Sequence, residues 1–381
     1  MKVPVPCVKG KSIFYAIIHF FSLFIMVQVF LLDYVVVFSS YSEAGHHSHR
    51  SLPPFTLNNV PEELRYIPHT TLQTWSERDY LIVFGIPSVD IASRRSRRSL
   101  QRSTCWQFPG VARRANNFTG DMLVLYVLAR HPSHGYRYSA ALLKEVEAYH
   151  DVITLPMNEG RSTTKKSISG KGYWGTEAEI GMSRKTYLWF QLALRFFPVV
   201  AYIAKGDDDV FVRVPQFLSD LRSVPRRGLY MGGYYGVWRG KRAKPPNVYF
   251  IIGYCMTLAR DVAEQLVTFK PVHRLVHLPY SKKRKAEFMA LNMEHEDIMV
   301  GRVLLHEIQY ELLHLVKVDY CRFSNIRNDS GHSLVTSTSI VIHHLEESDY
   351  GDLMRQFGKI TSPVPLKLKI ESHNISLISC V

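Results

Sequence analysis

Three adjacent carboxylates, Asp207, Asp208 and Asp209, are the side chains in this sequence that point most directly to chemistry. Adjacent carboxylates repel one another unless a cation or solvent relieves them. Largely apolar runs flank them at residues 199–204 and 210–214, and an acidic triplet between two buried strands is costly without a ligand. Divalent cations such as Mg²⁺ and Mn²⁺ prefer oxygen ligands and bridge to phosphate oxygens. The triplet therefore favours a metal site that holds a diphosphate over a solvated turn.

Two further pairs carry groups of similar chemistry, and each has a structural alternative. Glu296 and Asp297 precede an apolar Ile-Met-Val run. They would suit the first turn of a helix, where the helix dipole stabilises acids. His343 and His344 stand near the end of the apolar run SIVIHHL. A histidine in such a run is either a packed core residue or a metal ligand, and both interpretations stay open.

The elements that must position the acidic triplet alternate between strands and helices. The patterns predict strands at residues 81–85, 122–128, 152–155 and 199–204, and helices at 139–149 and 184–197. This alternation is typical of an α/β fold with a mostly parallel sheet. Ligands of such sheets bind beyond the carboxyl ends of the strands. The aspartates directly follow the last of these predicted strands, which places them at that edge.

Five segments, in order along the chain, resemble motifs of the family 31 glycosyltransferases. This family includes β1,3-galactosyltransferases, β1,3-N-acetylglucosaminyltransferases and fringe-type enzymes. KGDDDVFVRV at 205–214 is similar to K-x-DDD-V-F-V-N-V. The other four segments are RRSLQRSTCW at 97–106, GYCMT at 253–257 followed by Arg260-Asp261, EDIMVG at 296–301 and VIHHL at 341–345. The resemblance extends from Tyr80 to Gln356.

The resemblance implies a GT-A fold, with a Rossmann-like, mostly parallel sheet in a single catalytic domain. It implies an inverting β1,3-glycosyltransferase that uses Mn²⁺ or Mg²⁺ and transfers Gal or GlcNAc from UDP-Gal or UDP-GlcNAc to a glycan acceptor on a glycoprotein or glycolipid. An inverting displacement needs one general base and a stabilised leaving diphosphate. The resemblance implies that Asp297 is the general base and that Asp209 is the principal metal ligand. His343 would be a further metal ligand, with His344 as the alternative. Asp207 and Asp208 would contact the ribose and the surroundings of the metal, and Arg102 would lie near the nucleotide.

Two positions depart from the family pattern. Bulky residues at 249–252 replace a small, glycine-rich approach to Gly253, which leaves the shape of the donor or acceptor pocket open. Arg213 stands where the family has asparagine. Neither departure removes a proposed catalytic group.

The N-terminal residues predict a membrane anchor. Residues 13–32 are apolar without a full charge, and as a helix they are long enough to cross a hydrocarbon core. Lysines precede and acids follow them, so the positive-inside rule places residues 1–12 in the cytosol and the rest in the lumen. A cleaved signal peptide is the alternative, although its apolar region would be unusually long. Residues 33–78 are predicted to form a stem and 79–381 the catalytic domain of a single-pass type II Golgi membrane protein.

A lumenal location would permit disulfides and N-glycosylation. Four cysteines allow three pairings, and the sequence selects none of them: Cys105, Cys255, Cys321 and Cys380. Glycosylation sequons begin at Asn117, Asn328 and Asn374.

The chain of 381 residues has 47 Lys+Arg and 33 Asp+Glu, a formal charge of +14. A hydrophobic content of 46% excludes a wholly disordered chain. The basic excess favours an anionic partner, and residues 91–120, with seven arginines and no acid, are predicted to offset part of the diphosphate charge. The KKRK run at 282–285 is either an acceptor contact or a solvated loop, and we favour the loop. A nucleic-acid-binding protein conflicts with the lumenal topology and lacks a known motif. A non-catalytic glycan-binding or chaperone-like relative is the main alternative.

Overall fold

The computed structural model describes residues 60–166, 172–233, 235–239, 247–327 and 335–380. The predicted cytosolic tail, the predicted membrane segment at 13–32, most of the predicted stem and the sequon at Asn328 lie outside these residues. Among the helices of the described part, none is both long and apolar enough to cross a membrane.

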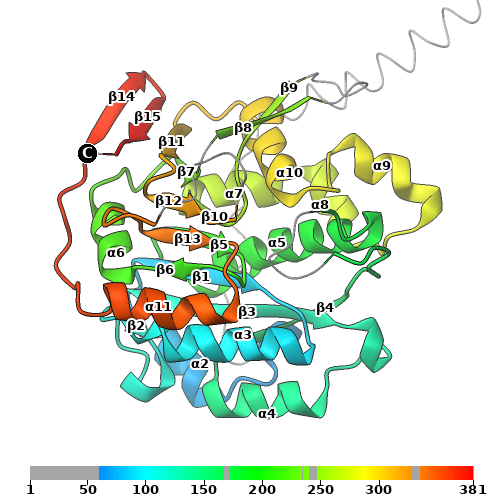
Figure 1. Ribbon diagram of the computed structural model, residues 1–381. Coiled ribbons are helices and arrows are strands. Elements are labelled where there is room, and N and C mark those ends of the chain that lie inside the picture. The colour runs from blue at the N-terminus through cyan, green and yellow to red at the C-terminus, as the bar shows by residue number, and fades with distance from the viewer. Residues whose placement is uncertain (1–59, 167–171, 234, 240–246, 328–334, 381) are drawn as a thin grey trace, which may run out of the picture. The chain divides into compact units, whose positions relative to one another are not determined.

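Within the described residues, a sheet of ten strands forms the centre of the fold (Figure 1). In spatial order the strands are β14 (Leu368–Ser372), β15 (Ile375–Ile378), β11 (His314–Val318), β7 (Leu229–Gly233), β10 (Cys255–Ala259), β5 (Tyr202–Gly206), β1 (Ile82–Pro87), β3 (Met122–Arg130) and β2 (Val111–Ala112), with β4 (Val152–Asn158) also paired to β3. The pairings are parallel except those of β10 with both neighbours and of β14 with β15. The predicted mixed α/β fold with a largely parallel sheet is confirmed.

Two smaller sheets bring distant segments of the chain to the edge at which the parallel strands of this sheet end. One consists of β12 (Phe323–Asn325), β13 (Val341–His343) and β6 (Phe211–Val212). The other is a hairpin of β8 (Tyr235–Arg239) and β9 (Asn247–Ile251). Because β6 directly follows the acidic triplet and β13 ends at a histidine, their antiparallel pairing sets these chemical groups side by side.

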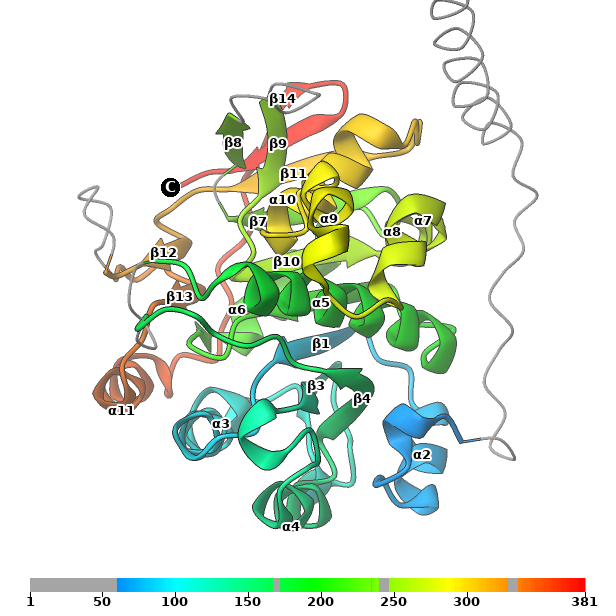
Figure 2. The same ribbon diagram turned by 90° about the vertical axis from the view of Figure 1, so that its right-hand side faces the viewer.

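Helices cover both faces of the main sheet (Figures 1 and 2). The α-helices of the described residues are α2 (His69–Ser76), α3 (Ala92–Ser103), α4 (Ala140–Tyr149), α5 (Thr176–Phe196), α6 (Val214–Arg222), α7 (Arg260–Thr268), α8 (Lys270–Val276), α9 (Lys285–Ala290), α10 (Glu296–Arg302) and α11 (Glu347–Phe357). The short helical turns are η2 (Glu62–Leu64), η3 (Cys105–Gln107), η4 (Arg114–Asn116), η5 (Pro132–His134), η6 (Lys282–Arg284) and η7 (Val303–Glu307).

Adjacent residues of β1 show how the two faces are packed. Successive side chains of a strand point to opposite faces. A Cβ atom at Gly85 would lie 2.2 Å from the indole of Trp189 in α5, so this face admits the helix only because the side chain is absent. On the other face, the ring of Phe84 lies 6.0 Å from that of Trp106 and 6.2 Å from that of Phe217 in α6. A strand buried on both faces reads as a continuous apolar run, which explains why this strand was predictable.

The predicted stem at 33–78 is too long, because its last residues belong to the folded body. η2 and α2 begin directly after Pro61 and Pro68. Trp75 of α2 is 1% exposed and makes edge contacts with the rings of Phe118 and Phe196. Proline is well tolerated at the start of a helix, so these prolines mark helix starts rather than an extended chain.

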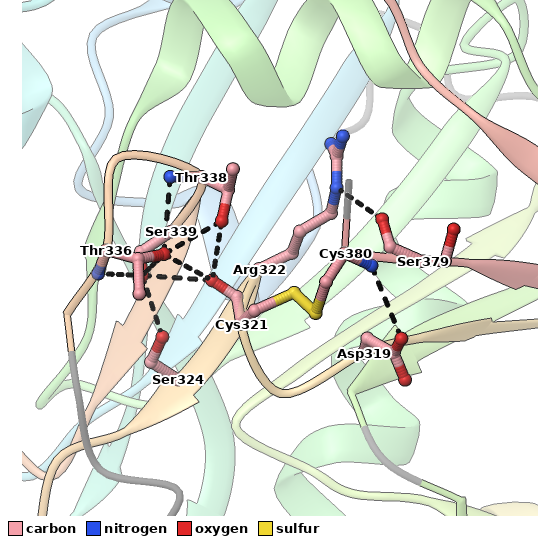
Figure 3. The surroundings of a disulfide bond; sticks show 9 residues. All are labelled: Asp319, Cys321, Arg322, Ser324, Thr336, Thr338, Ser339, Ser379 and Cys380. Carbon is pink, nitrogen blue, oxygen red and sulfur yellow. Dashed lines mark hydrogen bonds between the residues drawn. A yellow bond between two sulfur atoms is a disulfide. The ribbon is translucent and has the colours of Figure 1, made fainter.

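Of the four cysteines, Cys321 and Cys380 form a disulfide (Figure 3). The disulfide ties the end of the described chain to the segment before β12, and the backbone N–H of Cys380 also donates to Asp319. Cys105 and Cys255 are buried free thiols. The sequon residues Asn117 and Asn374 are both exposed.

Candidate active site

The three aspartates leave β5 at its carboxyl end, and their side chains reach different partners. Asp208 accepts a hydrogen bond from Ser88 Oγ at 2.8 Å and pairs with Arg94. Asp209 lies 3.2 Å from His343 Nε2, and Asp207 lies 3.4 Å from the same nitrogen. The cluster therefore joins the ends of β1, β5 and β13 with the first turn of α3.

Lys205 connects this cluster to the N-terminus of α10. Its side chain is fully buried, and Nζ lies 2.5 Å from Asp207 Oδ1 and 2.8 Å from Glu296 Oε1. Nζ also donates to the carbonyl oxygen of Gly253 at 2.8 Å. Burial alone would lower the pKa of a lysine, but the two carboxylates raise the pKa of Lys205 above its ordinary value. A permanent positive charge thus holds Asp207 and Glu296 at a fixed separation.

His343 and His344 bring imidazole nitrogens to Asp209. The ligand atoms of these three residues all lie within 4.8 Å of one another. The ring of His343 stacks on that of Tyr254 at 4.7 Å and on that of His344 at 4.0 Å. Its Nδ1 is buried without a hydrogen-bond partner among the described residues. His344 Nδ1 contacts Asn325 Oδ1 at 2.7 Å.

The two histidines have opposite electrostatic environments. Burial opposes protonation of His343, but Asp209 and Asp207 raise its pKa to about 9. Burial and the positive charge of His343 lower the pKa of His344 to about 4. Burial raises and His343 lowers the pKa of Asp209, and the net shift is downward. The pair of carboxylates thus attracts a positive charge to this position, and the mixed oxygen and nitrogen donors fit a cation such as Mn²⁺.

Asp297 lies in the first turn of α10, so the helix-start interpretation of this residue is confirmed. Its half-buried carboxylate accepts from the backbone N–H groups of Gly253 at 3.2 Å and Ile298 at 2.8 Å. Burial, followed by the neighbouring charge of Glu296, raises the pKa of Asp297 to about 7. A helix-start carboxylate with a pKa near neutrality can also accept and release a proton at physiological pH.

Gly253 is the point at which Asp297 and the acidic cluster are joined. A Cβ atom there would lie 2.4 Å from Glu296 Oε1 and 3.3 Å from Asp297 Cβ. The residue thus lets the loop after β9 approach the start of α10 closely enough to bond Asp297 through N–H and Lys205 through C=O. Of the bulky residues at 249–252, Ile251 is buried and Tyr249 stacks on His306 at 5.8 Å.

The structure does not bring Arg102 to the acidic cluster. Its guanidinium makes ion pairs with Asp151 at 2.7 Å and Glu145 at 2.8 Å, two turns along α3 from the contact of Arg94 with Asp208. Arg213, which stands where the family has asparagine, donates to the carbonyl oxygens of Ser337 and Ser339 and has a structural role.

Sequence reasoning missed four residues that lie against the cluster. Ser88 and Arg94 contact Asp208. The guanidinium of Arg94 also lies 6.0 Å from the ring of Trp174, and the ammonium of Lys166 lies 5.1 Å from the same ring. The charge of Lys166 contributes to the low pKa of His344. An arginine within an arginine-rich run and a lysine in a loop carry no individual signal in the sequence.

Comparison with known proteins gives a distant structural likeness only. No protein-family model and no curated protein matches the chain. Among solved structures, the chain is similar to a glycosyltransferase involved in the glycosylation of the major capsid of PBCV-1. The identity is 12%, the match covers 72% of this chain and 99% of that chain, and the TM-score is 0.30. A likeness of this degree transfers neither an activity nor a residue role to this chain.

Proposed function

We propose that this protein is an inverting, UDP-sugar-dependent glycosyltransferase with Asp297 as its general base. The observation that carries the proposal is the pairing of two different sites across Lys205. On one side, Asp209 and His343 form a cation-attracting cluster. On the other side, a carboxylate with a pKa of about 7 stands on the N-terminal turn of α10. Such a pair supplies a place for a leaving diphosphate and a separate base for an incoming hydroxyl.

In this mechanism Asp297 accepts the proton of an acceptor hydroxyl as the oxygen attacks the anomeric carbon. The N–H groups of Gly253 and Ile298 hold the carboxylate in place. A divalent cation, Mn²⁺ or Mg²⁺, held by Asp209 and His343, with His344 as the alternative, would stabilise the charge on the leaving UDP. Arg94, which pairs with Asp208, and Lys166, whose charge acts on His344, add positive charge on the same side.

Lys205 joins the two halves of the site. It neutralises Asp207 and Glu296, the acids that lie between the cation-attracting cluster and Asp297. Without that charge, three carboxylates would repel one another, and the pKa of Asp297 would rise further. The lysine is therefore a positioning residue, which acts through the carboxylates that it holds.

The finer assignments belong to the same proposal and are supported by the ordered motif resemblance. The enzyme would transfer Gal or GlcNAc from UDP-Gal or UDP-GlcNAc and form a β1,3 linkage to a glycan on a glycoprotein or glycolipid. Asp207 and Asp208 would contact the ribose and the surroundings of the metal. The protein would be a type II Golgi protein anchored by residues 13–32. The position of Arg102 away from the cluster makes Arg94 the better nucleotide contact.

A screen of UDP-sugars against the full-length chain tests the proposal. Hydrolysis and transfer to a mixture of glycans are measured with Mn²⁺ and with EDTA, for the wild type and for Asp297→Asn. Asp121→Asn is the matched control, because this aspartate is exposed and pairs with Arg222 away from the site. We expect Mn²⁺-dependent transfer that Asp297→Asn abolishes and the control retains. Glycan binding without turnover of any UDP-sugar would overturn the proposal in favour of a non-catalytic relative.

A further inference from the structure

Three ring side chains from separate elements meet beside the proposed base. Trp238 comes from β8, His295 immediately precedes α10, and Tyr173 lies three residues before α5. The ring centroids of Trp238 and His295 are 4.9 Å apart, and those of Tyr173 and His295 are 6.2 Å apart. All three side chains are half-buried, so each keeps part of its surface accessible to solvent.

Two contacts place this ring cluster next to the carboxylates, one at His295 and one beside Tyr173. His295 is the N-cap residue of α10, directly before Glu296 and Asp297. At the other end, the backbone N–H of Trp174, next to Tyr173, donates to Glu179 Oε1 at 2.8 Å. Burial raises the pKa of Glu179, and the charges of Glu296 and Asp207 raise it further. The ring cluster thus borders the same group of acids that the proposed reaction uses.

The chemistry of these rings differs from that of the cation-attracting cluster. None of the three is an acid, and burial lowers the pKa of His295, which leaves its imidazole neutral at pH 7. Two cations, Arg94 and Lys166, lie instead at the ring of Trp174. A diphosphate would therefore bind away from the ring cluster. Flat faces with a few polar atoms suit a ligand that is apolar on one face and polar at its edge.

A pyranose ring is such a ligand, because its C–H groups form an apolar face and its hydroxyls form a polar rim. We propose that Trp238, His295 and Tyr173 form the acceptor subsite, where a sugar ring of the acceptor glycan stacks and directs one hydroxyl at Asp297. This inference rests on the proposed function and deepens it. In the reaction, the acceptor O–H proton passes to Asp297, the acceptor oxygen bonds to C1 of the donor sugar, and the bond from C1 to the phosphate oxygen breaks. UDP leaves with that electron pair.

Trp238→Ala and Trp238→Phe in the full-length chain test the subsite. The probes are p-nitrophenyl β-galactoside and p-nitrophenyl β-N-acetylglucosaminide as acceptors, with the UDP-sugar that the wild type hydrolyses as donor. We expect Trp238→Ala to raise the KM of the acceptor about tenfold, equal to about 1.4 kcal/mol, with a much smaller change in the KM of the donor. Trp238→Phe keeps a stacking ring and should recover most of the acceptor affinity.

Tyr249→Leu is the matched control. Tyr249 lies on β9 of the same hairpin, but it pairs with Val237 rather than with Trp238, so it faces the opposite side, where it stacks on His306. An equal rise in acceptor KM in this control would show that hairpin disruption, not lost stacking, causes the effect. An unchanged acceptor KM in Trp238→Ala, or equal changes in donor and acceptor KM, would overturn the subsite. Failure of the wild type to hydrolyse any UDP-sugar would instead overturn the proposed function.

Discussion

The charge state of Asp297 links the proposed catalysis to the stability of the fold. Burial and Glu296 raise its pKa from 3.8 to about 7. A general base acts only in its ionised form, so kcat/KM should fall about tenfold for each pH unit below 7 and level off above it. Glu296→Gln removes the neighbouring negative charge but keeps an oxygen acceptor for Lys205. We therefore expect this variant to shift the midpoint of the pH profile to lower pH.

The same raised pKa predicts a stability change whose sign is fixed. An acid whose pKa is higher in the folded than in the unfolded chain favours folding most at low pH, and this contribution is lost as pH rises through the folded-state pKa. For pKa values of 3.8 unfolded and about 7 folded, ionisation of Asp297 destabilises the wild type at pH 8 by about 2–3 kcal/mol relative to pH 5. An asparagine side chain cannot ionise. The free energy of unfolding of Asp297→Asn, relative to wild type, should therefore increase by about 2–3 kcal/mol from pH 5 to pH 8.

Urea unfolding of the wild type and Asp297→Asn at both pH values measures this difference. The substituted amide loses one of the two backbone N–H bonds that the carboxylate accepts, which costs about 1 kcal/mol at either pH and so cancels in the comparison. Asp121→Asn, which replaces an exposed carboxylate, should show no comparable pH dependence. A constant difference between Asp297→Asn and wild type, together with a flat kcat/KM between pH 5.5 and about 8, would refute the raised pKa and the assignment of the base.

Three further predictions test other parts of the site and the fold. Asp209→Asn removes a charged ligand and should weaken Mn²⁺ binding at least about tenfold, measured by calorimetry without any sugar; unchanged affinity would move the cation site elsewhere. Gly253→Ala places a Cβ 2.4 Å from Glu296 Oε1 and should lower kcat about tenfold or more with little change in donor KM, whereas full kcat would mean that the contact between Lys205 and Glu296 is dispensable. Cys380→Ser opens a disulfide between residues 59 apart and should lower the free energy of unfolding by about 2–4 kcal/mol; a reductant should then have no additional effect, and an additional loss would point to another disulfide.

The central strands were predictable because burial on both faces leaves a plain apolar signature. β1, β3 and β4 match the predicted runs, and α4 begins after Ser139, the first residue of the predicted helix, which caps it. The first two turns of α5, at 176–183, were not predicted. Arg184 and Lys185, where the predicted helix begins, read as surface residues because they are charged. Both are buried, and Lys185 Nζ donates to the carbonyl of Ser88 at 2.7 Å. A polar residue that finds a partner far away in the sequence cannot be told from an exposed one by periodicity alone.

The residues of the candidate site also differ in whether the sequence could predict them. Asp209, Asp297 and His343 stand in short motifs whose residue types already indicate chemistry, and the structure brings Asp209 and His343 together. The contact of Lys205 with Glu296 spans 91 residues of sequence, and that of Arg94 with Asp208 spans 114. Such contacts follow from the order of strands in the sheet, and a one-dimensional pattern does not encode that order.

The arginine-rich segment at 91–120 shows how a charge run in sequence differs from a charged surface. Arg98 is fully buried and pairs with Glu145 at 2.6 Å, and Arg102 pairs with Asp151 at 2.7 Å. Removing one partner of a buried ion pair lowers the free energy of unfolding by about 3–5 kcal/mol. These arginines therefore stabilise the packing of α3 against α4 and β4. Arg94, in the first turn of α3, instead faces the cation-attracting cluster through Asp208. Of the arginines predicted to offset a diphosphate, Arg94 is therefore the one that we propose as the nucleotide contact.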